Sequence, residues 1–134
     1  MLKTELYWLT MTTMMTGLLW MPYIVNRMLE VGVIKAMMDS NADTTPIADW
    51  GKRMMKAHSN AVENLVVFAP LVLVLSISGL STALTAKAAM IYFFARLTHY
   101  LVYTAGVPVI RTITFIIGVV CQMIMALTIL GVLK

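Results

Sequence analysis

Three long stretches of the sequence contain no charged side chain, and this feature limits the fold more than any other. The stretches are residues 6–26, 64–86 and 112–133; a fourth, residues 88–110, is interrupted by a single charged residue, Arg96. A helix of about 20 apolar residues crosses the roughly 30 Å hydrocarbon core of a membrane. We therefore predict an all-α integral membrane protein, a single domain over residues 1–134 with transmembrane helices at about residues 4–29, 51–79, 83–105 and 108–133.

The composition excludes several other classes of protein. Apolar residues make up 60% of the chain and charged residues 12%, against about 45–50% and about 25% in soluble domains. So apolar a chain excludes a soluble monomer and intrinsic disorder. One cysteine forms neither a disulfide framework nor a cysteine-based metal site, and a net charge of +4 is too small to indicate nucleic-acid binding. We expect membrane lipids as partners, no nucleic acid and no metal.

The connections predict how the helices are arranged. Short turns at Ser78-Gly79 and at Gly106-Val107-Pro108 join the last three predicted helices, which makes the four helices an antiparallel bundle. The longest polar connection, residues 30–50, is expected to be a loop outside the bilayer. Pro22 and Pro70 fall within apolar stretches and are expected to bend their helices, with neighbouring groups bonding the freed carbonyls.

The distribution of basic residues predicts the orientation in the membrane. Cytoplasmic segments next to membrane spans carry an excess of Lys and Arg. Three basic residues, Lys3, Lys87 and Lys134, lie nearer one end of the predicted bundle. Seven lie nearer the other end: Arg27, Lys35, Lys52, Arg53, Lys56, Arg96 and Arg111. We expect the loop of residues 30–50 in the cytoplasm and both termini in the periplasm, in a bacterial inner membrane.

Several charged residues lie where charge is costly, and helical spacing gathers them at one depth. A charge within a membrane span normally pairs, faces a wet cavity or serves function. One face of the third predicted helix carries Tyr92, Arg96, His99 and Tyr103; one face of the second carries Arg53, Lys56, Asn60, Glu63 and Asn64; one face of the fourth carries Arg111, Phe115, Gly118 and Gln122. Arg27 closes the first helix at the same level.

This set of residues contains more cations than anions. Its one carboxylate is Glu63, and its five cations are Arg27, Arg53, Lys56, Arg96 and Arg111. Glu63 can neutralise one of these cations, Arg96 or Arg53. The excess predicts an anionic ligand, and one with two carboxylates and one ammonium fits best; Tyr103 and Thr112 would add hydrogen bonds. Taken singly, Arg27, Lys52 and Arg53 at the ends of spans are better explained as anchors that reach the headgroups, and Arg111 fits either interpretation equally.

Two blocks of the sequence resemble a known family. The run Lys56-Ala57-His58-Ser59-Asn60-Ala61-Val62-Glu63-Asn64 is similar to the second-helix signature of the membrane-associated proteins in eicosanoid and glutathione metabolism, the MAPEG superfamily. Arg96, His99 and Tyr103, followed by Arg111-Thr112, resemble the third and fourth helices of that family. Together the blocks cover about residues 53–115.

The resemblance implies a homotrimer that binds glutathione between subunits near the cytoplasmic side. By position, the tripeptide would contact Arg27, Lys56, Asn60, Glu63, Arg96, His99, Tyr103 and Thr112, with Glu63 on its ammonium group. Arg111 would lie beside the sulfur as the catalytic residue. The implied activity is a detoxifying transferase or peroxidase that acts on hydrophobic electrophiles or lipid hydroperoxides. Two positions depart from relatives: Lys56 replaces an arginine, and Phe115 replaces a tyrosine proposed to assist at the sulfur.

Two other functions remain open. Some members of the family bind lipid without catalysis, and this chain would then bind no glutathione. A small multidrug exporter is the third hypothesis, but it would need a carboxylate buried in an early span. The stretch of residues 6–26 contains none.

Overall fold

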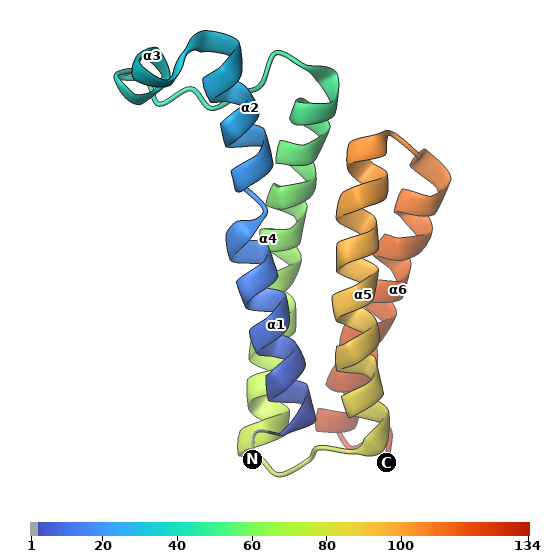
Figure 1. Ribbon diagram of the computed structural model, residues 1–134. Helices are drawn as coiled ribbons and strands as arrows, with labels where there is room; N and C mark the ends of the chain where they lie inside the picture. The colour runs from blue at the N-terminus through green and yellow to red at the C-terminus, as the bar shows by residue number, and fades with distance from the viewer. Residues whose placement is uncertain (1–2) are drawn as a thin grey trace.

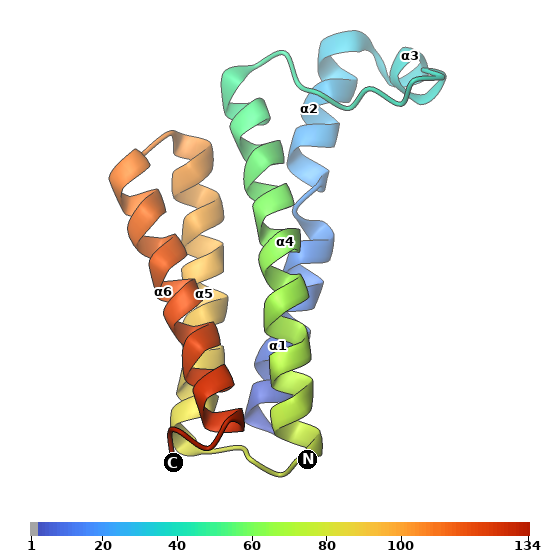
Figure 2. The ribbon, with the colours of Figure 1, turned by 180° about the vertical axis from the view of Figure 1, so that it is seen from behind.

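The computed structural model describes residues 3–134, and the regular structure of these residues is entirely helical. The helices are α1 (Thr4–Leu18), α2 (Met21–Val31), α3 (Val33–Met37), α4 (Asp49–Ile77), α5 (Ala83–Ala105) and α6 (Pro108–Ile129). Helices α1 and α2 continue along one line, so that with α4, α5 and α6 they form an antiparallel bundle of four rods (Figure 1). Both termini lie at one end, and α3 with its loop lies at the other (Figures 1 and 2). The predicted all-α class is confirmed.

Two of the helices present exposed apolar surface of the kind that suits lipid. Within the described residues, α4 and α6 are the two helices long and apolar enough to cross a bilayer. Only 22% and 33% of their most apolar windows are buried. The core helix of a soluble protein would bury most of such a window, whereas an exposed apolar face suits lipid.

The first rod is interrupted where the sequence predicts a bend. Helix α1 ends at Leu18, and Pro22 stands in the first turn of α2. Proline has no N–H to donate, and its ring clashes with the carbonyl of the residue four positions earlier, here Leu18. The next carbonyl, that of Leu19, accepts a hydrogen bond from the Tyr100 hydroxyl of α5 at 2.9 Å. A neighbouring helix therefore satisfies the backbone at the interruption, as a lipid-embedded break requires.

The tightest packing lies in the half of the bundle that contains the termini. Phe68 of α4 and Tyr92 of α5 stack with their ring centroids 3.8 Å apart. Small side chains beside them, Ala88 and Ala89 of α5, are buried and allow the helices to approach closely. Asn60 of α4, His99 and Tyr103 of α5 and Arg111 of α6 lie farther toward the other end of their helices.

The turn between α5 and α6 is built by local chemistry. Gly106 adopts φ +79°, a left-handed conformation that suits glycine at the end of a helix. Pro108 then begins α6, where its missing N–H costs nothing. From α4, the Arg53 Nε donates a hydrogen bond to the Thr104 carbonyl at 2.9 Å. This bond ties the turn to α4 and fixes the start of α6, which carries Arg111.

A buried carboxylate lies at the start of the first helix, contrary to the expectation that the first span has none. Glu5 is 2% exposed and accepts a hydrogen bond from the Thr85 hydroxyl at 2.7 Å. Hydropathy places Glu5 just outside the uncharged stretch, but α1 begins at Thr4 and turns this side chain inward. The absence of an early buried carboxylate is therefore not an argument against transport in this chain.

Candidate functional site

Two adjoining hollows lie between α4 and the α5–α6 pair, toward the end of the bundle opposite the termini. One, of about 300 Å³, is lined by Met55, Lys56, Ser59, Asn60, Glu63 and Tyr103. The other, of about 190 Å³, is lined by Asn60, His99, Tyr103, Arg111, Thr112 and Phe115. Asn60 and Tyr103 line both hollows, which we therefore describe together as the polar groove. Figure 2 shows the three helices that form it. Seven of the nine predicted site residues line it.

The charges of the polar groove have no ionic partners among residues 3–134. Lys56 and Arg111 are its cations and Glu63 is its carboxylate. No ion pair within residues 3–134 includes any of these three side chains. The expectation that Glu63 would neutralise Arg96 or Arg53 is wrong, because both arginines donate hydrogen bonds to neutral oxygens instead. The groove thus presents both signs of charge to whatever enters it.

Arg111 is held over an aromatic ring. Its guanidinium carbon lies 4.7 Å from the centroid of Tyr103, a cation–π contact. The Tyr103 ring in turn meets His99 edge-on, with centroids 5.6 Å apart. Thr112 donates its hydroxyl proton to the Pro108 carbonyl at 3.0 Å, so its oxygen faces the groove as an acceptor. Arg111 is therefore a fixed cation at the narrow end of the groove.

His99 positions the start of α6. Its side chain is buried, and Nδ1 lies 3.0 Å from the Arg111 carbonyl. A carbonyl only accepts, so Nδ1 carries the proton. Nε2 is buried and has no partner among residues 3–134. His99 thus fastens α5 to the residue whose side chain is the catalytic candidate, and only an edge of its ring reaches the groove.

Arg96 lies behind the groove. It is 2% exposed, and its Nη2 donates to the Asn60 side-chain oxygen. Because arginine has only donors, the Asn60 atom that faces it must be the carbonyl oxygen. Asn60 itself lines both hollows. Nε and Nη1 of Arg96 have no partner in the described chain. Arg96 therefore orients Asn60 and does not line the groove.

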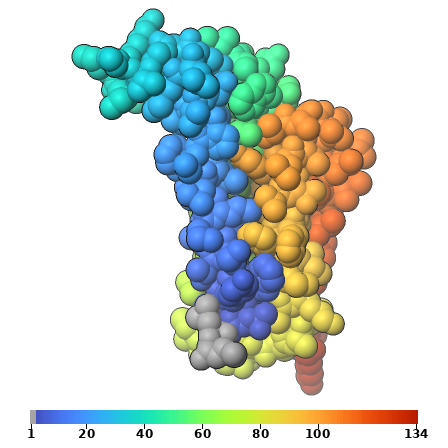
Figure 3. Space-filling view, viewed as in Figure 1, coloured from blue at the N-terminus to red at the C-terminus, as the bar shows by residue number. Residues whose placement is uncertain are grey.

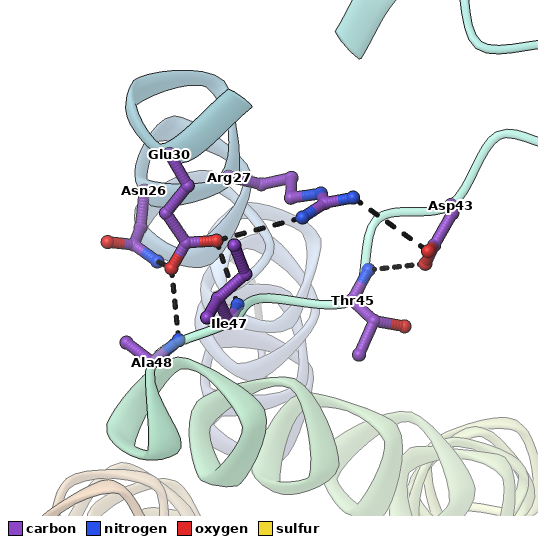
Figure 4. Close-up of polar contacts among 7 residues, drawn as sticks. All are labelled: Asn26, Arg27, Glu30, Asp43, Thr45, Ile47 and Ala48. Atoms are coloured by element: carbon purple, nitrogen blue, oxygen red, sulfur yellow. Dashed lines mark hydrogen bonds and ion pairs between the residues drawn. The ribbon is translucent and has the colours of Figure 1, made fainter. Parts of the chain in front are cut away.

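Arg27 is not brought to the polar groove. It forms ion pairs with Glu30 at 3.9 Å and with Asp43 at 3.8 Å (Figure 4). Glu30 also accepts bonds from the Asn26 side chain at 2.7 Å and from the N–H groups of Ile47 and Ala48 at 2.8 and 3.0 Å. These contacts, which we call the elbow network, join the end of α2 to the start of α4. The segment that this network holds, α3 with its loop, is called the elbow. Figure 3 shows it extending beyond one side of the bundle.

The elbow network is outside the membrane spans, and it perturbs the pKa of both its carboxylates. Hydrogen bonds from the Ile47 and Ala48 N–H groups and from Asn26 hold the pKa of Glu30 below its usual value. The bond from the Thr45 N–H, at 3.0 Å, lowers the pKa of Asp43 in the same way. Donors that favour the ionised form act in this direction. The elbow network therefore contains two carboxylates whose hydrogen-bond and ionic partners are supplied by the chain itself.

Some contacts that shape the groove could not be found from the sequence. Gln122 of α6 is buried and donates to the Asn64 carbonyl of α4 at 3.2 Å, which closes the groove toward the core. Glu30 carries the elbow network although nothing in its surroundings in the sequence marks it. Helical spacing places Gln122 on the same face of α6 as Arg111, but its bond to Asn64 depends on how α6 meets α4.

The fold and the polar groove together define a helical protein with long apolar helices and a groove that contains two cations and one carboxylate. The chain belongs to the MAPEG family, whose model matches residues 6–131. It is thus a membrane protein related to glutathione and eicosanoid metabolism. No curated protein and no solved structure matches it.

Proposed function

We propose that this protein is a glutathione-dependent membrane transferase, with hydroperoxide reduction as a second use of the same thiolate. The observation that carries the proposal is the polar groove, where Lys56, Arg111 and Glu63 lack ionic partners within residues 3–134. Lys56 and Glu63 are exposed and Arg111 is half-buried in the single chain; a neighbouring subunit packed over the groove would withdraw these charges from water, where unpaired charges are costly. A ligand with both signs of charge would satisfy them, and glutathione has two carboxylates, one ammonium and a thiol.

The groups of glutathione match the groove in order. Glu63 suits the ammonium group, and Lys56, two turns away on the same face of α4, suits a carboxylate. The Asn60 amide nitrogen supplies a donor between them, and Tyr103 and Thr112 add hydroxyl groups. In this arrangement the thiol reaches Arg111. Arg96 and His99 serve as positioning residues for Asn60 and for the start of α6.

The chemistry requires a stabilised thiolate. A free thiol has a pKa of about 8.5, and the thiolate is the nucleophile. A fixed guanidinium in a site of low dielectric favours the anion. The thiolate then forms a carbon–sulfur bond with an apolar electrophile as the leaving group departs with its electron pair. With a lipid hydroperoxide, two molecules of glutathione are oxidised to the disulfide while the hydroperoxide is reduced to alcohol and water.

The membrane arrangement belongs to the same proposal. Helix α5 and the α1–α2 rod complete a four-span bundle with α4 and α6. We place the elbow in the cytoplasm and the termini in the periplasm of a bacterial inner membrane, because basic residues gather at the elbow end. The polar groove would lie at the contact of neighbouring subunits in a homotrimer, with the apolar substrate arriving from the lipid.

Binding of glutathione to the purified protein in detergent tests the proposal. Calorimetry should show saturable binding, and the ultraviolet absorbance of thiolate should rise as glutathione is added at neutral pH. Binding without this absorbance would point to a relative that holds glutathione without activating it. No binding and no absorbance would support the lipid-binding, non-catalytic alternative.

A further inference from the structure

A second, separate hollow lies along the seam between α5 and α6. It has a volume of about 360 Å³ and is lined by Leu84, Lys87, Ala88, Ile91, Ile116, Ile117, Val120, Cys121 and Ile124. It shares no residue with the polar groove. We call it the apolar groove, since Lys87 is its only charged or polar side chain apart from the thiol of Cys121.

The shape of the apolar groove follows from the sizes of its residues. Its floor consists of the small side chains Ala88 and Cys121, which are 2% and 3% exposed. Its walls are large aliphatic side chains such as Ile91, Ile116 and Val120, which are 45–53% exposed. Between Leu84 and Ile91 it follows about 10 Å of helix axis, at about 1.5 Å per residue. A narrow apolar channel of this length, open along its side, has the form of a bed for an extended hydrocarbon chain.

We propose that the apolar groove binds an acyl chain of an anionic phospholipid, whose phosphate pairs with the Lys87 ammonium. Lys87 stands one turn into α5, near the end of the bundle that contains the termini, where a membrane surface would lie. Its long aliphatic stem can cover apolar surface while the ammonium reaches the headgroups.

The charge of Lys87 favours an anionic phospholipid over two other possible occupants, a zwitterionic lipid and a second copy of this chain. No ion pair within residues 3–134 includes Lys87, so its charge is available to a ligand. A zwitterionic lipid would fill the groove equally well but would gain less from one cation. A second copy of this chain would leave Lys87 against an apolar helix unless that copy supplied a carboxylate at the same depth.

Native mass spectrometry of the intact protein released from nanodiscs tests this site. The nanodiscs contain equal amounts of phosphatidylglycerol and phosphatidylcholine with identical acyl chains. The wild type should retain the anionic lipid over the zwitterionic one by about fivefold, the factor expected of one lysine near an anionic surface. Lys87→Gln should remove the preference. Lys134→Gln, which removes a lysine outside the groove at the same end of the bundle, should preserve it.

A second variant tests the groove itself. Val120→Trp narrows the groove from an exposed position of its wall and should lower the retention of both lipids, with the oligomeric state and helix content unchanged. Equal retention of both lipids by the wild type would overturn the proposal, as would a preference that survives in Lys87→Gln. If Val120→Trp dissociates the oligomer, the groove is a contact between copies of the chain and the proposal fails. These outcomes do not depend on glutathione binding, so they are independent of the proposed function.

Discussion

The polar groove and the elbow network use similar side chains with opposite results. In the elbow, Arg27 meets two carboxylates and Glu30 accepts three hydrogen bonds as well as one ion pair. In the groove, Arg111 rests on an aromatic ring and Glu63 has no ionic partner among the described residues. The elbow is therefore satisfied by the chain and holds a loop, whereas the groove lacks partners that a ligand would supply. The number of charges in a region therefore says less about function than whether those charges are paired within the chain.

The largest expected effect separates the two arginines. Arg111→Ala should reduce turnover by about 10²–10³-fold, as the loss of one fixed donor at a developing charge does in other enzymes. The thiolate absorbance should disappear while the oligomer stays intact. The matched variant Arg27→Ala should leave both the absorbance and the affinity for glutathione unchanged. If Arg27→Ala weakens binding as much as Arg111→Ala, the elbow belongs to the site in the assembled protein.

The next effect concerns the unpaired carboxylate of the groove. Glu63→Gln should weaken glutathione binding by about tenfold, the lower range for a hydrogen bond between charged groups. A glutathione analogue without its α-amino group provides the control in calorimetry. The wild type should bind this analogue about tenfold more weakly than glutathione, and the variant should bind both equally. If the variant still distinguishes the two ligands, Glu63 does not contact the ammonium group.

A smaller effect is expected from acid at the elbow. The pKa values of Glu30 and Asp43 are lower in the folded protein than in the unfolded chain. Their stabilisation is thus complete above the ordinary carboxyl pKa of about 4 and is lost as the pH falls through the lowered values. Pepsin should cleave residues 38–48 severalfold faster as the pH decreases through that range. In the double variant Glu30→Gln, Asp43→Asn, cleavage should already be fast at the upper end, and an unchanged profile would show that these carboxylates do not hold the loop.

The elements that could be predicted from the sequence are those determined by residues close together in the chain. Uncharged stretches indicate apolar helices, Gly106 and Pro108 mark the turn between α5 and α6, and Pro22 marks the interruption before α2. Each of these depends on residues close together in the chain. The spacing within each helix also gathered the residues of the polar groove on the correct faces.

The features that could not be predicted are contacts between separate helices and loops. The bond between Arg96 and Asn60 depends on the rotation of α5 relative to α4, which the periodicity of either helix alone does not determine. The level of Arg27 at the end of the first helix and the resemblance place it with the ligand site, whereas its pairing with Asp43 across a long loop does not follow from helical spacing. Glu5 was overlooked because its burial depends on the position of Thr85, far away in the sequence. Pairing across elements is therefore where a structure adds most to a count of charges.

The smallest effect tests whether the lysine at position 56 limits the affinity of the polar groove for glutathione. Lys56 has a compact charge, whereas an arginine would grip a carboxylate through two parallel N–H bonds. Lys56→Arg should raise the affinity for glutathione by about two- to threefold, a modest gain because exposed pairs are screened by solvent. Lys52→Arg is the matched control, since Lys52 pairs with Asp49 at 3.7 Å and lines neither hollow. Calorimetry that finds the same gain in both variants would attribute it to general charge at this end of α4, and a loss in Lys56→Arg would mean that the groove is too narrow for the larger head.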